Sequence, residues 1–233
     1  MSLTEQLLRP LLTASGARPL ITHYDDATGS RVELSVATMA NWAAKTANWL
    51  VEEFDVEPGD KVAVRLPAHW QTAGVLLGAW WCGAQVVPEA AGARIAFVTT
   101  EEQGPDTAVV SLDPMGRGLS TRASDGALDY LSEARLSGDE FSPLFPVPGD
   151  TPALLSSTVD EVLAEARARA ASSGISPGDR VLSTVEWDLP EGVLTGLLAP
   201  LTAGAHLVQV SNPDPAKLDG HRSTERAGVD LLA

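Results

Sequence analysis

The stretch VEPGDKVAVRLPAHWQTAGVLLGAWWCGAQVV at residues 56–87 returns, in altered form, as ISPGDRVLSTVEWDLPEGVLTGLLAPLTAGAHLVQV at residues 175–210. Both copies have a Pro-Gly-Asp turn, a strand-like run, a Gly-Val-Leu helix opening and a Gly-Ala pair before a second apolar run. Proline sets φ for the turn, and glycine relieves it. The short strands show no polar alternation, which is typical of strands covered on both faces. The helices expected over 69–83 and 189–203 are apolar almost all round, which predicts that both are buried, with Val75, Trp80 and Trp81 in the core.

Each copy therefore predicts a strand, a crossover helix and a parallel strand. Two such βαβ units predict an α/β fold with layered, mostly parallel sheets, flanking helices and right-handed crossovers. We expect 61–66 and 180–185 to be buried strands in two related units. The alternative is that the similarity is accidental, because Pro-Gly-Asp turns before strands are common. The 233 residues suit two small domains, 1–125 and 126–233 with a polar C-terminal tail, or one continuous domain.

Composition narrows the classes of partner and site. The formal net charge is −15 and no cluster of Lys and Arg stands out, which argues against binding to nucleic acid or to anionic membranes. The N-terminus lacks the pattern of a signal peptide, and no apolar run is long enough to span a bilayer, so we expect a cytoplasmic protein. Cys82 lies alone within an apolar helix and is expected to be a core residue. The four histidines show no metal-ligand spacing, so we predict no metal.

Other elements follow from periodicity and end signals. Ser2 and Glu5 have capping-box spacing at the start of an amphipathic first helix, which is the element we expect to meet a partner. The tail from residue 211 is polar and is expected to be largely loop. The remaining expected elements are a strand pair over 19–24 and 31–36, helices over 3–14, 36–54 and 159–171, short strands over 95–99 and 108–112, and turn-rich or proline-rich segments over 113–126 and 137–152.

Several of these stretches resemble one family. PGDKVAVRLP at 58–67 and GAWWCGAQVVP at 78–88 are similar to the early strand and the following helix-to-strand turn of the adenylate-forming, AMP-binding enzymes. This superfamily includes acyl-CoA synthetases, luciferases and non-ribosomal-peptide adenylation domains. SPGDRVL at 176–182 and GLLAPL at 196–201 resemble the segment after the family's phosphate loop. The resemblance covers 20–90 and 150–210 and implies the N-terminal domain fold of these enzymes. More narrowly, the chain is similar to a short actinobacterial family of uncharacterised AMP-binding-like proteins.

The chain departs from the family where the chemistry should lie. The family's phosphate loop is rich in Ser, Thr and Gly and ends in Pro-Lys-Gly; this chain has only Ser156, Ser157 and Thr158 between strand and helix. We treat these three as a degenerate phosphate-loop position, with a helix cap as the stronger interpretation. Where the family places a His or an aromatic residue, this chain has Glu186-Trp187-Asp188. The resemblance makes Trp187 and Asp188 candidate substrate-pocket residues.

No catalytic residue and no cofactor is predicted. The family's later motifs for adenine, ribose and magnesium, and its C-terminal domain with a catalytic lysine, find no match here. We therefore expect a pseudoenzyme that serves as a binding or scaffold module. Its binding partner is expected to be another protein or a second copy of the chain. The alternatives are a truncated acyl-CoA synthetase-like enzyme that needs a partner or retains acyl, nucleotide or CoA binding, and a domain that merely folds. The isolated chain is expected to show no ATP-dependent adenylation.

Overall fold

The computed structural model of the chain describes residues 1–102, 104–123 and 126–233. The predicted domain boundary after residue 125 lies next to residues outside this described part. In chain order the elements are α1 (Leu3–Ser15), β1 (Pro19–Asp25), β2 (Ser30–Ser35), α2 (Val36–Phe54), β3 (Lys61–Arg65), α3 (Trp70–Trp81), β4 (Gln85–Val87), β5 (Ala96–Val98), β6 (Thr107–Val109), β7 (Leu128–Asp129), α4 (Tyr130–Ala134), β8 (Pro152–Leu154), β9 (Ser157–Thr158), α5 (Val159–Ser172), β10 (Arg180–Ser183), η1 (Val193–Leu198), α6 (Ala199–Ala203), β11 (His206–Ser211), α7 (Pro215–Glu225) and β12 (Val229–Leu231).

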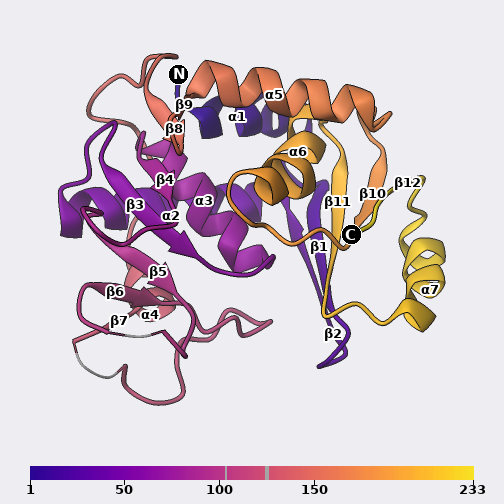
Figure 1. Cartoon of the computed structure of the whole chain (residues 1–233), viewed down its shortest axis with the longest axis horizontal. Coiled ribbons are helices and arrows are strands. Elements are labelled where there is room, and N and C mark those ends of the chain that lie inside the picture. Colours follow the sequence, from indigo (N-terminus) through magenta and orange to yellow (C-terminus); the bar gives the residue numbers. More distant parts are fainter. Residues whose placement is uncertain (103, 124–125) are drawn as a thin grey trace.

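The strands form two sheets with helices against them (Figure 1). One has five strands in the order β12-β10-β11-β1-β2, and the other has seven in the order β7-β6-β5-β3-β4-β8-β9. Among the described strands, β1–β2 and β8–β9 pair antiparallel and the other pairs are parallel. The middle residues of β3 and the last three of β10 are buried. The prediction of a layered, mostly parallel α/β fold is therefore confirmed.

The two predicted repeat units make the same turn with the same hydrogen bonds. In the first, Gly59 N donates to Gly83 O at 2.9 Å, and in the second Gly178 N donates to Gly204 O at 3.2 Å. The Asp carboxylate of each turn accepts a bond from the backbone three residues earlier. Gly59 has φ of +92° and Gly178 has φ of +87°, values that only glycine adopts without strain. Each unit then closes as a parallel strand pair, β3 with β4 and β10 with β11.

Each unit is preceded by an antiparallel hairpin and a helix, and the two hairpins are exchanged. Hairpin β1–β2, which leads into the first unit, pairs through β1 with β11 of the second unit. Hairpin β8–β9, which leads into the second unit, pairs through β8 with β4 of the first. Each sheet is thus completed by chain from the other half. The seven-stranded sheet also takes strands from both sides of residue 125, and the division into two subdomains stays a prediction.

Helix α3 lies at the centre of the molecule and contacts α1, α2 and strands of both sheets. Val75 and Trp80 are buried as expected, whereas Trp81 is only partly buried and packs at the edge of the core. Gly78 allows α2 to approach closely, because a Cβ there would lie 2.3 Å from Thr46 Cβ. Thr4 of α1 donates its hydroxyl to Leu77 O within the core, which fixes the first helix on α3.

The C-terminal third departs from the expectation mainly in its tail. The helix expected over 189–203 is present over 191–203, with a π-helical segment, η1, ahead of α6. The expectation that the tail is largely loop is wrong, because it holds α7 and β12. Asp214 caps α7 with Pro215 in its first turn, and the buried Glu225 at its end accepts hydrogen bonds from Tyr24 and Arg31. Among the described residues, no helix has the length and apolar content required to cross a bilayer.

Candidate functional site

The degenerate phosphate-loop position is a tight hairpin turn. Strands β8 and β9 pair antiparallel through Leu154 and Ser157, so only Leu155 and Ser156 connect them. Leu155 has φ of +51°, and its amide donates to Val86 O at 2.9 Å. A phosphate loop needs several consecutive amides that converge on one point. Two connecting residues, one of them already bonded to β4, offer no such cradle.

Thr158 is fully engaged in capping α5. Its Oγ1 accepts from Glu161 N at 3.3 Å, and its own amide donates to Glu161 Oε2 at 2.9 Å, which completes a capping box. Such a cap stabilises a helix by about 1 kcal/mol. The Glu161 carboxylate occupies the place where an anion would meet the helix N-terminus. Ser156 and Ser157 are exposed beside it. The cap that the sequence indicates for Thr158 is present.

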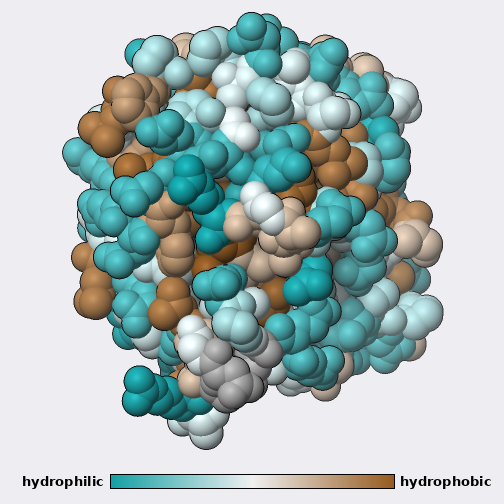
Figure 2. Space-filling view, turned by 60° about the vertical axis from the view of Figure 1, so that its left-hand side comes forward, coloured by the Kyte–Doolittle hydropathy of each residue, from teal (hydrophilic) through white to brown (hydrophobic). Residues whose placement is uncertain are grey.

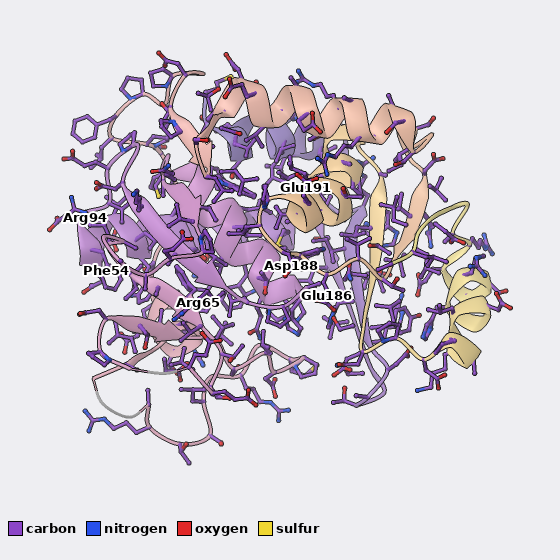
Figure 3. All side chains as sticks on the ribbon, in the orientation of Figure 1. Phe54, Arg65, Arg94, Glu186, Asp188 and Glu191 are labelled. Carbon is purple, nitrogen blue, oxygen red and sulfur yellow. The ribbon has the colours of Figure 1, made fainter. Side chains whose placement is uncertain are left out.

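A groove of about 570 Å³ runs from Ser157 along α5 to the start of η1. Its charged residues are Glu161, Glu165, Glu191 and Arg169. Arg169 forms ion pairs with Glu165 at 2.8 Å and Glu191 at 2.7 Å. Figure 3 shows Glu191 just below α5, in the connection that leads to η1. The three carboxylates outnumber the single guanidinium, which gives the groove an anionic character that opposes a triphosphate.

In the connection after β10, Trp187 is buried and Asp188 is exposed. Trp187 is 3% exposed and packs against Gly196 of η1, where a Cβ would lie 2.9 Å from its Nε1. This Nε1 is buried and has no hydrogen-bond partner among the described atoms. Asp188 is exposed, and its backbone carbonyl accepts from Gly192 N at 2.9 Å. Trp187 therefore fills space beneath η1, and neither residue lines the acidic groove.

Residue Glu186 connects the two halves of the molecule. Its Oε2 accepts from Ala68 N at 3.4 Å, so the connection after β10 contacts the connection after β3. Figure 3 places Glu186 and Asp188 near the middle of the molecule, between the two sheets. At this junction Ser211 Oγ donates to Ala68 O at 2.6 Å and lies 2.9 Å from His23 Nε2.

A pair of histidines lies at the same junction, although sequence spacing gave no sign of it. The rings of His23 and His69 meet edge to face with centroids 4.3 Å apart. Burial lowers the pKa of His23 to about 4 and that of His69 to about 3. Both rings are therefore neutral at pH 7 and are weak bases. Among the described residues no group of His, Cys, Asp and Glu is arranged to hold a metal ion.

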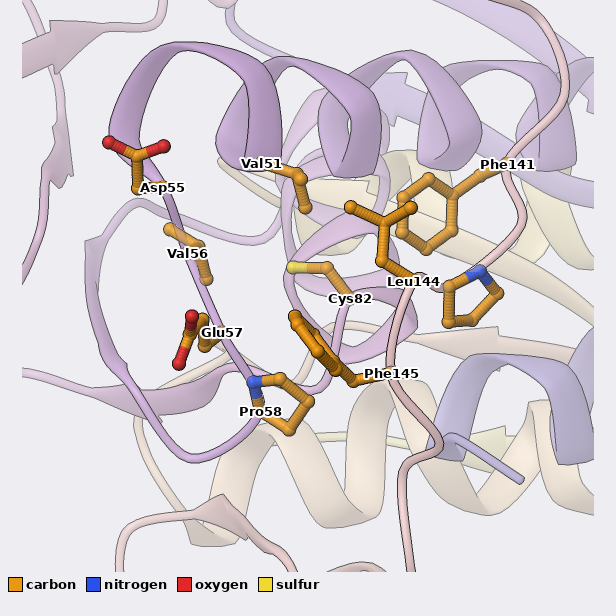
Figure 4. A pocket seen from close by; sticks show the side chains of 10 residues that line it. Val51, Asp55, Val56, Glu57, Pro58, Cys82, Phe141, Leu144 and Phe145 are labelled. Carbon is orange, nitrogen blue, oxygen red and sulfur yellow. The ribbon is translucent and has the colours of Figure 1, made fainter.

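A second, apolar pocket of about 180 Å³ lies between the end of α2 and the segment 141–145 (Figure 4). Cys82 lies in its wall, and its thiol donates to Ala79 O. Burial raises the pKa of Cys82 to about 12, so the thiol is not a nucleophile at neutral pH. Leu144 and Phe145 at its mouth are exposed. Figure 2, which turns this side forward, shows hydrophobic patches separated by hydrophilic side chains.

The comparisons with known proteins agree with this fold. A protein of Mycobacterium tuberculosis described as a "TIGR03089 family protein" is 44% identical over 237 residues, with 97% of this chain and 96% of that protein covered. The chain belongs to the TIGR03089 family. No family model matches the chain.

Solved structures similar to this TIGR03089 family member are acyl-CoA synthetases. The Brucella canis acyl-CoA synthetase superposes with a TM-score of 0.76 at 16% identity and covers 100% of this chain. The Streptomyces lividans acetoacetyl-CoA synthetase gives 0.73 at 19% identity, again over 100% of this chain. The N-terminal domain of FACL13 from Mycobacterium tuberculosis gives 0.67 at 19% identity over 97%. The match spans only 47%, 42% and 61% of these three chains, respectively. The fold is that of the N-terminal domain of AMP-binding enzymes.

Proposed function

We propose that this TIGR03089 family member is a non-catalytic relative of the adenylate-forming enzymes that acts as a binding or scaffold module. One observation carries the proposal: the phosphate-loop position is a two-residue turn followed by a closed capping box. The acidic groove beside it adds support, because its three carboxylates repel a nucleotide triphosphate.

The expected loss of catalysis is large. Adenylyl transfer depends on positioning the phosphates and neutralising their charge, with little covalent chemistry supplied by the protein. Removal of one preorganised donor of this kind costs about 2.7–4 kcal/mol in transition-state stabilisation. The hairpin lacks the converging amides, and the helix that follows it directly, α5, contains no lysine. Several such losses together would remove useful turnover.

A second candidate function is a partial enzyme that needs a partner or retains acyl, nucleotide or CoA binding. The shared fold supports it, since the Brucella canis and Streptomyces lividans proteins with which the chain superposes are synthetases. A partner chain could then supply the missing groups. Under either function we propose that the chain binds a protein partner or a second copy of itself. We also propose a cytoplasmic location.

Carboxylate-dependent exchange of pyrophosphate into ATP tests the proposal. The purified chain should show no exchange with short, medium, long-chain or aromatic acids. Ser156→Ala and Ser157→Ala are suitable variants because both side chains are exposed and their loss should not disturb folding. Exchange by the wild-type chain that disappears in these variants would contradict the proposal. Exchange only in the presence of cell extract would support the partial enzyme instead.

A thermal-shift screen separates loss of catalysis from loss of binding. ATP, AMP, CoA and acyl-CoAs should each be added at several concentrations, because a ligand that binds only the native state raises the apparent stability. We expect no shift with ATP or AMP. A nucleotide-dependent shift that survives Ser156→Ala and Ser157→Ala would show that a nucleotide binds elsewhere on the chain.

A further inference from the structure

A cavity of about 310 Å³ lies between α1, α5 and the C-terminal end of α6. Its wall includes four leucines that belong to the core: Leu7, Leu11, Leu163 and Leu201. Figure 1 shows α1 and α5 lying alongside each other, and the two helices are in contact. The remaining lining residues are Gln6, Pro10, Ala14, Arg18, Arg167, Pro177, Thr202, Ala203 and Gly204.

The charges around this cavity are unusual for so acidic a chain. Arg18 and Arg167 both line it, and no Asp or Glu does, although the chain carries a net charge of −15. Within the described part of the chain neither guanidinium forms an ion pair. Arg18 is held in place by one bond, from Nη2 to Gly204 O at 2.9 Å. This bond also neutralises the negative end of α6.

Two polar atoms in the wall of the cavity lack partners. Arg18 Nε and Thr202 Oγ1 are both buried, and neither has a hydrogen-bond partner among the described atoms. Most buried polar groups are hydrogen-bonded, and an unsatisfied one costs about 1–3 kcal/mol. The Thr202 hydroxyl can turn about its single χ1 bond, and a ligand oxygen that draws the Arg18 side chain toward the cavity would satisfy Nε.

We infer that this cavity binds a small anion with a short aliphatic tail, such as a short-chain carboxylate. Guanidinium groups match carboxylates in charge and in fork geometry. The exposed Pro10, Ala14 and Pro177 provide an apolar surface for the tail above the buried leucines, with about 25 cal/mol per Å² of buried apolar area. The volume lies at the lower end of the range for ligand pockets, about 300–1,000 Å³, which suits a small ligand.

The cavity is distinct from the acidic groove, and the inference does not depend on the proposed function. Helix α5 presents Glu161 and Glu165 to the groove, and Leu163 and Arg167 to the cavity. Residues four apart share one face of a helix, so α5 separates an acidic face from a basic one. A catalytic and a non-catalytic chain could both carry this site.

Isothermal titration with hexanoate is the first test. We expect saturable binding of hexanoate to the full chain, and much weaker binding of hexanol, which has the tail without the charge. Inorganic phosphate, which has charge without a tail, should also bind much more weakly. Equal binding of hexanol would overturn the anion site, and equal binding of phosphate would overturn the role of the tail. No saturable binding of hexanoate would overturn the inference altogether.

Variants then locate the site. Arg167 is exposed, so Arg167→Gln should fold normally and weaken hexanoate binding about tenfold, the equivalent of about 1.4 kcal/mol. Arg9→Gln is the matched control, since Arg9 is exposed on α1, makes the same change in net charge and does not line the cavity. It should change the affinity less than twofold. Equal effects of the two substitutions, or amide NMR shifts on hexanoate addition that avoid Thr202 and Gly204, would refute the site.

Discussion

The two repeat units have the same turn and the same strand pairing, but they differ at the position that joins each to its neighbour. After the Gly-Ala pair, the first unit has Gln85 and the second has His206. Gln85 Nε2 donates to Leu155 O in the β8–β9 hairpin. His206 Nε2 lies 2.8 Å from Thr22 Oγ1 on β1. Both side chains therefore tie a unit to the hairpin exchanged from the other half, one with an amide and one with a titratable ring.

This difference shows how a repeated unit diverges while its backbone is preserved. The turn hydrogen bonds fix the strand register, and any side chain of suitable length can then bridge to the next strand. Three histidines are buried on one side of the molecule: His23 and His206 lie in strands of the five-stranded sheet, and His69 packs against His23. No histidine lies in the described strands of the seven-stranded sheet. The two sheets should consequently respond differently to acid.

Acidification gives the largest expected effect. Burial lowers the pKa of His206 to about 4, as it does that of His23, and the pKa of His69 is about 3, against about 6.5 in the unfolded chain. The unfolded state therefore binds protons below pH 6.5 that the folded state excludes. Stability is complete above pH 6.5 and is lost as the pH falls toward 4. Each histidine contributes up to about 1.4 kcal/mol per pH unit in this window.

Urea unfolding at pH 7.5, 6.5 and 5.5 measures this loss. His206→Gln gives the second unit the residue of the first. It should reduce the slope of the free energy of unfolding against pH by the contribution of one histidine, about 1.4 kcal/mol per pH unit. Its stability at pH 7.5 should stay close to that of the wild-type chain. A slope that is unchanged in His206→Gln would show that this ring is already protonated or exposed in the folded state.

Close helix packing gives the next largest effect, and its size should differ between the helices of the two units. Gly78→Ala would place a Cβ 2.3 Å from Thr46 Cβ and 2.9 Å from the backbone oxygen of Ala43. We expect a loss of about 2–3 kcal/mol in the free energy of unfolding, because α2 cannot yield locally. Gly196→Ala meets mainly the Trp187 ring at 2.9 Å, which can shift, so its cost should be smaller, about 1–2 kcal/mol.

Gly220→Ala is the control for this comparison. Gly220 lies in α7, and a Cβ there meets nothing within 4 Å. Alanine is the better helix former by about 0.5–1 kcal/mol, so this variant should be slightly more stable than the wild-type chain. Equal losses for Gly78→Ala and Gly196→Ala would mean that η1 is as tightly held as α3.

The sequence predicts the local features well because short-range chemistry decides them. Helix α2 has the predicted bounds, with Ser35 as its cap, and Thr158 caps α5 as its spacing with Glu161 indicates. Asp214-Pro215 signals the start of helix α7, but the polar composition of the segment predicts a loop, which hides the helix. The π-helical turn η1 left no signal, because an apolar run shows no periodicity from which an extra residue could be read.

Features that join distant parts of the chain could not be predicted. The exchange of hairpins depends on which strand edge is free once the helices have packed, and no local pattern states that. His23 and His69 come together because β1, which holds His23, lies against the start of α3, which His69 caps. Arg18 and Arg167 likewise share a cavity only because α1 packs beside α5. Among the candidate residues, Trp187 was the least predictable, since its burial depends on Gly196 of η1.

The smallest expected effect compares the two turn aspartates. Asp179 Oδ2 accepts from Ser176 N at 2.7 Å, whereas Asp60 Oδ2 accepts from Glu57 N at 3.0 Å and also pairs with Arg94 at 2.9 Å. Loss of the backbone bond should cost each turn about 1 kcal/mol. Asp60→Ala should cost up to about 1 kcal/mol more than Asp179→Ala at low ionic strength, because it also breaks an exposed ion pair. Urea unfolding in low and high salt tests this: at about 1 M salt, where charges are screened within about 3 Å, the two variants should become equal. A difference that persists in high salt would mean that Asp60 supports its turn through packing, and the two turns would then not be energetically equivalent.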